Sequence, residues 1–205
     1  MSVTFLITTY NRQESCQRLV DALQGQGDIL VLNDGCEYRL NGCMQIFQLH
    51  RGKQQYWMTV NNLFQNRPKA DYYFMLPDDF LPKEDMVEKA IRIWDGITSP
   101  QKICLTLATD RLGCACWTKF TPEDEGDVLL SQWMDMCFMC ENKFFTVLKR
   151  ITEIHMNWNS GRVKSSGVGS QISRRLFSMG YHLYQVKESL VTVQNEHLIS
   201  KMHEK

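Results

Sequence analysis

Short β-branched or apolar runs alternate with amphipathic helical patterns through the first 110 residues, and this alternation constrains the fold more than any other feature. The expected strands are residues 3–8, 28–32, 44–49, 72–76 and 103–108. Apolar residues recur at helical spacing between residues 16 and 23, over 55–65 and after Pro82. Strands that alternate with helices predict an α/β fold, a mostly parallel doubly wound sheet whose ligand crevice lies at the carboxyl ends of its strands.

The pattern is weaker beyond residue 110. We expect further elements, in chain order, as a strand at 113–117, an acidic loop at 123–127, a strand or helix at 133–139, a helix at 142–151, a glycine- and serine-rich loop at 160–170, a helix at 171–179 and a strand at 181–186. No repeat or linker interrupts the chain, so residues 1–205 are expected to form a single domain.

The composition, 43% hydrophobic and 22% charged, is typical of a globular protein with one sizeable core. The first residues, MSVTFLITTYNR, carry no basic segment ahead of their short apolar run and indicate a strand, not a signal peptide. No stretch approaches the roughly 18 to 20 apolar residues of a membrane-spanning helix. We therefore expect no membrane span and a soluble, cytoplasmic protein.

The eight cysteines indicate free thiols, because nothing in the sequence signals secretion. Cys114 and Cys116 with Cys137 and Cys140 could form a four-thiolate zinc site. The residues inside the second pair are apolar, whereas zinc knuckles usually have a polar, glycine-bearing turn there. Buried small hydrophobes are therefore the favoured interpretation of these cysteines.

The net charge of zero conceals an asymmetry along the chain. Residues 1–142 carry 13 basic and 19 acidic side chains, and residues 143–205 carry 10 and 4, which gives about −6 and +6. This layout can steer an anionic partner to the C-terminal part, although a solvated surface of mixed charge explains it equally well.

Asp78 and Asp79 are the most informative pair in the chain, because they follow an apolar strand directly. Adjacent carboxylates are costly unless a cation or a tight hydrogen-bond network compensates them. A hard divalent ion supplies such a cation and takes oxygen ligands. The alternative is that Asp79 merely caps the helix that follows Pro82.

Three segments in order resemble the GT-A glycosyltransferases, a Rossmann-like fold family, and in particular its small family-two-like members, some of them viral. They are FLITTYNR at 5–12, VLNDG at 31–35 and YFMLPDDFLP at 73–82. Tyr10 and Arg12 match a Tyr-Asn-Arg-like turn, and Asp34 matches an Asp-Asp-Gly turn. Asp79 matches the end of a metal-binding Asp-x-Asp motif, with Pro77 in place of its first acid.

The resemblance implies a nucleotide-sugar site in residues 1–110 and an acceptor site in 111–205. The implied donor-binding residues are Thr8, Thr9, Tyr10, Arg12, Asp34, Gly35, Lys53, Asn61 and Asp78. The implied ligands of Mn²⁺ or Mg²⁺ are Asp79, His197 and His203. An aromatic ring can cover a pyrimidine, and a carboxylate can accept its ring N–H. Packing, a common Asp-Gly turn and solvated charges remain the alternatives for these residues.

The resemblance resumes at SGVGSQISRRLFSMGYHLYQVKESLV but departs at one important place. Inverting members carry a Glu-Asp pair whose Asp is the general base, whereas this chain has Val168, Gly169 and Ser170. Either another acid is the base, with Asp135 the first candidate, or the enzyme retains the anomeric configuration and needs no such base.

The implied function is transfer of a sugar from a UDP-type donor to a hydroxyl acceptor. A hydroxymethylated pyrimidine in DNA, as for viral enzymes acting in the host cytoplasm, and a saccharide are both open as acceptors. The candidate acceptor residues are Arg162, Lys164, Ser170 and Arg174. A catalytically inactive nucleotide-binding module is the alternative. A sugar nucleotidyltransferase is disfavoured because TTYNRQES lacks the glycines of a phosphate loop.

Overall fold

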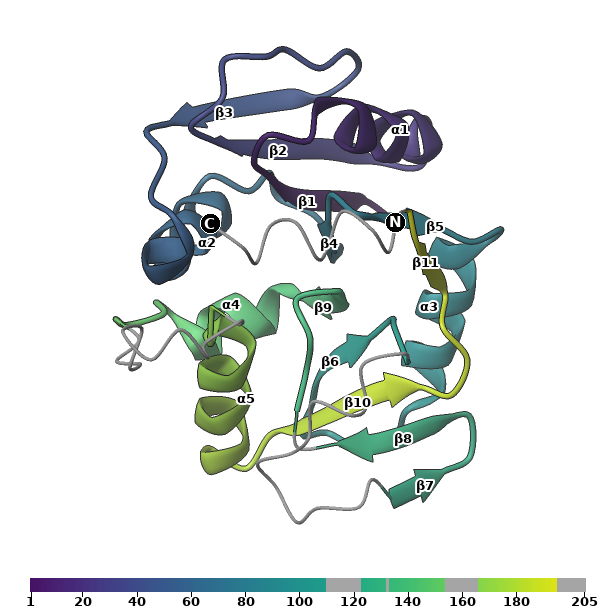
Figure 1. The fold of residues 1–205 in the computed structure, drawn as a ribbon. Coiled ribbons are helices and arrows are strands. Elements are labelled where there is room, and N and C mark those ends of the chain that lie inside the picture. Colours follow the sequence, from purple (N-terminus) through teal and green to yellow (C-terminus); the bar gives the residue numbers. More distant parts are fainter. Residues whose placement is uncertain (110–122, 132, 154–165, 195–205) are drawn as a thin grey trace.

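A mixed sheet of nine strands runs through the part of the protein that the computed structural model describes, residues 1–109, 123–131, 133–153 and 166–194 (Figure 1). Its strands, in spatial order, are β3 (Met44–Gln48), β2 (Asp28–Asp34), β1 (Val3–Thr9), β4 (Tyr72–Pro77), β9 (Phe138–Glu141), β6 (Lys102–Thr106), β10 (His182–Val186), β8 (Val128–Ser131) and β7 (Glu123–Glu125). Only β8 and β9 run against the other strands of this sheet. The predicted α/β class with a largely parallel sheet is confirmed.

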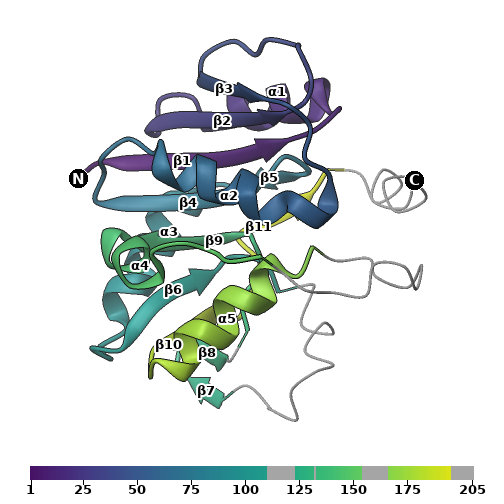
Figure 2. The same ribbon diagram turned by 90° about the vertical axis from the view of Figure 1, so that its left-hand side faces the viewer.

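Helices cover both faces of the sheet among the described residues. On one face lie α1 (Gln13–Leu23) and α3 (Met86–Gly96). On the opposite face lie α2 (Tyr56–Gln65), α4 (Asn142–Leu148) and α5 (Val168–Ser178), which stand in front of the strands in Figure 2. A further 3-10 turn, η1 (Lys53–Gln55), leads into α2.

The interior strand β1 shows why the sequences of the parallel strands are continuous apolar runs. Phe5 and Ile7 join the core under α1 and α3, whereas Leu6 joins the core under α2. A strand with helices on both faces buries successive side chains on alternate sides, so none of its positions needs to be polar. All seven residues of β1 are buried.

The C-terminal part differs from expectation in several places. The expected acidic loop at 123–127 is a hairpin of β7 and β8 that turns at Gly126, a glycine with φ of +70°. Its acidic side chains are exposed, so their charge does not prevent strand pairing. In the segment expected as a strand or helix at 133–139, strand β9 begins only at Phe138.

The tail also forms an unexpected strand. Beyond Ser189, β11 (Val191–Val193) pairs antiparallel with β5 (Phe80–Pro82) in a separate two-stranded sheet. The expected strand at 113–117 and most of the expected loop at 160–170 lie outside the described residues.

Cys137 and Cys140 are buried in the core, and burial raises the pKa of the Cys140 thiol well above its usual value. Cys114 and Cys116 lie outside the described residues. Within the described part of the chain, no helix is both long enough and apolar enough to cross a membrane.

Candidate functional site

Three neighbouring parallel strands end at the same edge of the sheet. β1 lies between β2 and β4, with Thr9 in register with Asn33 and Thr8 with Pro77. The turns after these strands therefore bring three of the predicted segments together, as expected for the carboxyl edge of a parallel sheet.

A cation already lies between the two adjacent carboxylates. Nη1 of Arg12 is 3.0 Å from Oδ1 of Asp78 and 3.2 Å from Oδ2 of Asp79. The hydroxyl of Thr9 donates to the other oxygen of Asp78 at 2.8 Å. All three charged side chains are at most 14% exposed. Burial raises the pKa of Asp78 to about 6, against the opposing effects of Arg12 and Thr9.

Asp34 is held rigidly at the end of β2. Its Oδ1 accepts from Nε2 of Gln48 at 2.6 Å and from the backbone N–H of Arg51 at 3.2 Å. The hydroxyl of Thr59 lies 3.5 Å from the same oxygen. Its Oδ2 lies 3.2 Å from Nδ1 of His50. Oδ1 therefore holds the carboxylate in place, and Oδ2 faces the half-exposed imidazole of His50.

Tyr10 and Gly35 both pack against His50, the partner of Asp34. The Tyr10 ring, 37% exposed, stacks on the imidazole of His50 with centroids 4.0 Å apart and planes within 13°. Gly35 has φ of +96°, and a Cβ there would lie 2.3 Å from Cβ of His50. Only glycine permits this approach, so Gly35 has a packing role beside its predicted role in donor binding.

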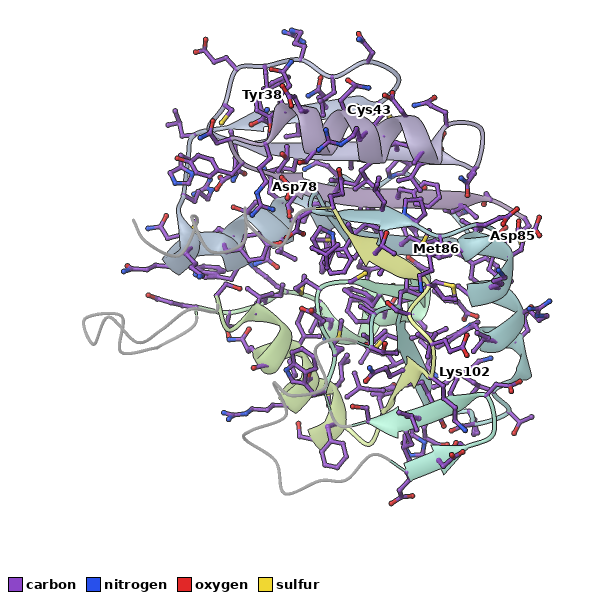
Figure 3. The ribbon with its side chains drawn as sticks, turned by 45° about the vertical axis from the view of Figure 1, so that its right-hand side comes forward. Tyr38, Cys43, Asp78, Asp85, Met86 and Lys102 are labelled. Atoms are coloured by element: carbon purple, nitrogen blue, oxygen red, sulfur yellow. The ribbon has the colours of Figure 1, made fainter. Side chains whose placement is uncertain are left out.

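Two tyrosines that the sequence did not single out complete the wall around β1. Tyr38 hydrogen-bonds Thr9 at 2.6 Å, and Tyr56 hydrogen-bonds Thr8 at 2.8 Å. Figure 3 shows Tyr38 and Asp78 in the same part of the molecule, far from Lys102. Burial raises the pKa of Tyr38 to about 12, so its hydroxyl stays protonated at neutral pH. Nothing in the sequence pattern distinguished these tyrosines from core residues.

Asp135 lies on the same side of the molecule as this cluster. The pKa of Tyr56 is raised chiefly by burial, and further by the charges of Asp78, Asp135 and Asp79. The charges of the paired acids and of Asp135 therefore both act on the Tyr56 hydroxyl. This carboxylate comes from the loop before β9, where its Oδ1 accepts from the backbone N–H of Met136 at 2.8 Å.

The loop that carries Asp135 packs on the first turn of α5. A Cβ at Gly169 would lie 2.9 Å from the carbonyl oxygen of Met134. The backbone N–H of Met134 donates to Ser173 at 3.0 Å, and Ser173 donates to the carbonyl of Gly169 at 2.7 Å. Asp135 thus sits beside the positions that lack an acid pair.

Gln194 connects the tail to the acidic turn, a role that no sequence pattern indicated. Its backbone N–H donates to the carbonyl of Asp79 at 2.7 Å. Its Nε2 lies within 3.2 Å of the carbonyls of Ser15, Asp78 and Phe80. Gln194, the last described residue, therefore lies at the acidic pair.

Other predicted residues lie elsewhere or beyond the described part of the chain. Asn61 uses its amide on the backbone of Ile151, donating at 2.8 Å and accepting at 2.9 Å. Lys53 opens η1, and Ser170 and Arg174 lie on α5. The predicted residues outside the described part are Arg162, Lys164, His197 and His203. The roles of all these residues stay predictions.

No protein-family model and no curated protein matches the sequence. Solved structures do match. GalNAc-T7, solved with UDP, GalNAc and Mn²⁺, aligns over 91% of this chain and 42% of its own, with 13% identity and a TM-score of 0.61. TarS 1–349 from S. aureus aligns over 98% of this chain and 63% of its own, with 8% identity and a TM-score of 0.63.

Glucosyl-3-phosphoglycerate synthase from Mycobacterium tuberculosis, solved with Mn²⁺ and UDP-glucose, gives a similar result. It aligns over 98% of this chain and 75% of its own, with 12% identity and a TM-score of 0.56. This chain thus spans less than half of GalNAc-T7 and under two thirds of TarS 1–349. At these identities the likeness concerns the fold, and the chain has the GT-A fold of the nucleotide-sugar glycosyltransferases.

Proposed function

We propose that the protein is a metal-dependent glycosyltransferase that moves a sugar from a UDP-type donor to a hydroxyl acceptor. One observation carries this proposal: an exposed aromatic ring, a fixed carboxylate and a buried acid pair with its arginine lie side by side at the carboxyl ends of β1, β2 and β4. The ring and the fixed carboxylate suit a pyrimidine, and the acid pair with its arginine suits the ribose and a metal-bound diphosphate.

The nucleobase contacts follow from Tyr10 and Asp34. The Tyr10 ring offers a flat apolar surface for a pyrimidine. Asp34 offers Oδ2 as the acceptor for the ring N–H of uracil, while Gln48 and Arg51 hold Oδ1. Cytosine has no N–H at that ring position and would leave the acceptor unsatisfied, so the site favours uracil.

The acid pair fits a divalent cation that enters with the diphosphate. Among the described residues, no group of three or more His, Cys, Asp or Glu side chains is placed to hold a metal. Mg²⁺ and Mn²⁺ bind through one or two carboxylates together with substrate phosphates, so Asp79 provides a suitable first ligand. The bound cation would neutralise charge on the departing diphosphate.

The tail offers a candidate for a further ligand. Gln194 is bonded to the backbone of Asp79, and three further residues can span at most about 11 Å. His197 is thus within reach of the acid pair, and we assign it, with His203 as the second candidate, to the metal. Arg12 would then exchange Asp79 for the diphosphate while keeping Asp78.

We assign the general base to Asp135. In an inverting transfer, the acceptor oxygen bonds to the anomeric carbon, the bond from that carbon to the diphosphate oxygen breaks, and the acceptor proton passes to Asp135. The location of Asp135 beside Gly169 and near Tyr56 supports this role. The exposed Arg174 and the adjoining basic chain are the acceptor side, which suits a hydroxymethylated pyrimidine in DNA or, alternatively, a saccharide.

The Arg12 contacts favour a second candidate, an inactive nucleotide-binding module. A guanidinium that already compensates both carboxylates removes the need for a metal to stabilise the folded site. The two candidates differ in their response to manganese. The active enzyme requires it for tight donor binding, whereas the module binds UDP with or without it.

Calorimetry of UDP binding with Mn²⁺, with chelator and in Asp79→Ala tests the proposal. We expect the affinity to fall about 10-fold or more on loss of either the metal or the carboxylate, because a charge-assisted contact is worth roughly 1.5–3 kcal/mol. Asp85→Ala, which removes an exposed acid ahead of α3, is the matched control. Equal affinity under all conditions would leave only the inactive module. Hydrolysis of UDP-sugars in the presence of Mn²⁺ then identifies an active enzyme.

A further inference from the structure

The imidazole of His50 occupies the place that the proposed function gives to the nucleobase. It lies flat on Tyr10, with ring centroids 4.0 Å apart. Its Nδ1 lies 3.2 Å from Oδ2 of Asp34 and 3.0 Å from the Asp34 carbonyl oxygen. Both oxygens are acceptors, so Nδ1 carries the proton and donates to Asp34.

This arrangement reproduces both contacts expected of uracil. A flat heteroaromatic ring covers the tyrosine, and a ring N–H points at the same carboxylate oxygen. We propose that His50 is an internal occupant of the nucleobase subsite, which a uracil-containing ligand must displace in order to bind. The inference rests on the proposed function, because it takes Tyr10 and Asp34 as the nucleobase contacts.

The local structure allows the side chain to leave while the backbone stays. The backbone of His50 is held against Gly35, where a Cβ would lie within 2.8 Å of the His50 nitrogen and Cα. The imidazole itself is 43% exposed and has solvent on one side. Rotation about the side-chain bonds therefore frees the subsite, whereas the turn that carries Asp34 keeps its shape.

Internal competition has a distinctive thermodynamic consequence. An occupant that must leave before binding reduces the apparent affinity of every ligand of the subsite by the same factor, the fraction of molecules in which the subsite is open. A ligand that binds only at Arg12 and the acid pair is not affected. If the His50 ring instead stacked on the bound nucleobase, its removal would lower the affinity for the ligand.

The experiment compares His50→Ala with the wild type by calorimetry, with uridine, UDP and inorganic pyrophosphate as probes, all with Mn²⁺. We expect uridine and UDP to bind about 3- to 10-fold more tightly to His50→Ala, by the same factor, since an aromatic pair and its hydrogen bond are lost from the free state. Pyrophosphate should bind with unchanged affinity. His182→Ala, on β10, is the matched control and should behave as the wild type.

A second readout does not depend on a variant. In the wild type, NMR signals of the His50 ring protons should lose the ring-current shift from Tyr10 when uridine is added. Weaker or equal uridine binding by His50→Ala, or a His50 signal that does not move on saturation, overturns the inference while leaving the nucleotide site intact. Absence of uridine and UDP binding in wild type and variant alike overturns the proposed function itself, and the inference with it.

Discussion

The sheet has two sides along its width, one from β3 to β4 and the other from β9 to β7, and they contribute to the candidate site in different ways. On one side, β3, β2, β1 and β4 are all parallel, and three adjacent strands end directly in site residues. On the other side, antiparallel β9 separates β4 from β6, and Asp135 comes from the loop before it. The first side fixes its groups through short turns, and the second through packing of a loop on α5.

This difference indicates that one side of the sheet recognises the donor and the other side serves the reaction with the acceptor. Groups such as Asp34, bonded by three neighbours, suit recognition of a constant donor. A loop carboxylate beside a helix suits chemistry on an acceptor, whose shape varies between enzymes. Variants on the two sides should therefore separate binding from turnover, and the following experiments test that separation.

Asp135→Asn should have the largest effect. Loss of a general base typically lowers kcat by about 10²- to 10⁴-fold, whereas the dissociation constant for UDP should not change, because the donor contacts come from the ends of β1, β2 and β4. Initial rates at saturating donor, with calorimetry of UDP, measure both quantities.

Asp127→Asn is the control, since this exposed acid belongs to the β7–β8 hairpin on the same side. A matching loss of UDP affinity in Asp135→Asn would show that Asp135 also supports donor binding. That result would contradict the separation of binding from turnover. A normal kcat would leave the transfer without its assigned base.

Asp78→Asn tests the donor side through pH. Burial raises the pKa of folded Asp78 to about 6 from 3.8, so the folded protein binds a proton that the unfolded chain releases between these values. The stabilisation is complete below about pH 4 and is lost as pH rises through 6. Relative to the wild type, Asp78→Asn should gain up to about 3 kcal/mol of unfolding free energy between pH 4 and 7.

Urea unfolding at intervals over that range provides the measurement, and the gain should level off above pH 7. Asp127→Asn should track the wild type throughout. Parallel stability curves for Asp78→Asn and the wild type would mean that Arg12 and Thr9 offset the burial of the carboxylate completely.

Asp34→Asn should weaken UDP binding by roughly 1 to 3 kcal/mol, because the uracil N–H loses its charged acceptor. The rate at saturating donor should stay close to that of the wild type. Asp28→Asn changes the exposed residue at the opposite end of the same strand and should leave binding unchanged. A reduced melting temperature with an unchanged dissociation constant would return Asp34 to the role of a turn residue.

The same contrast explains what could be predicted from the sequence. Asp34 and Asp78 follow strands whose pattern and turn are local, so their shared edge follows once the parallel order is assumed. The pairing of β11 with β5 joins segments over a hundred residues apart, and it places Gln194 at Asp79. No local signal encodes that pairing, the insertion of β9, or the ring of His50 over Tyr10.

The smallest expected effect concerns the acceptor side, where Arg174 is exposed on α5. If the acceptor is DNA, each phosphate neutralised by a basic side chain adds about −0.9 to the slope of log K against log salt. Arg174→Glu should lower the magnitude of that slope by about 1 and weaken binding nearly uniformly across sequences. Arg92→Glu makes the same charge change on α3, on the opposite face, and should leave the slope unchanged.

Binding and transfer are measured on hydroxymethylpyrimidine DNA, unmodified DNA and oligosaccharides at low and moderate salt. A saccharide acceptor shows little salt dependence, because no counterions are released from it. If DNA neither binds nor is modified at any salt, the basic C-terminal part is an ordinary solvated surface, and the acceptor of the second side is a sugar or a small metabolite.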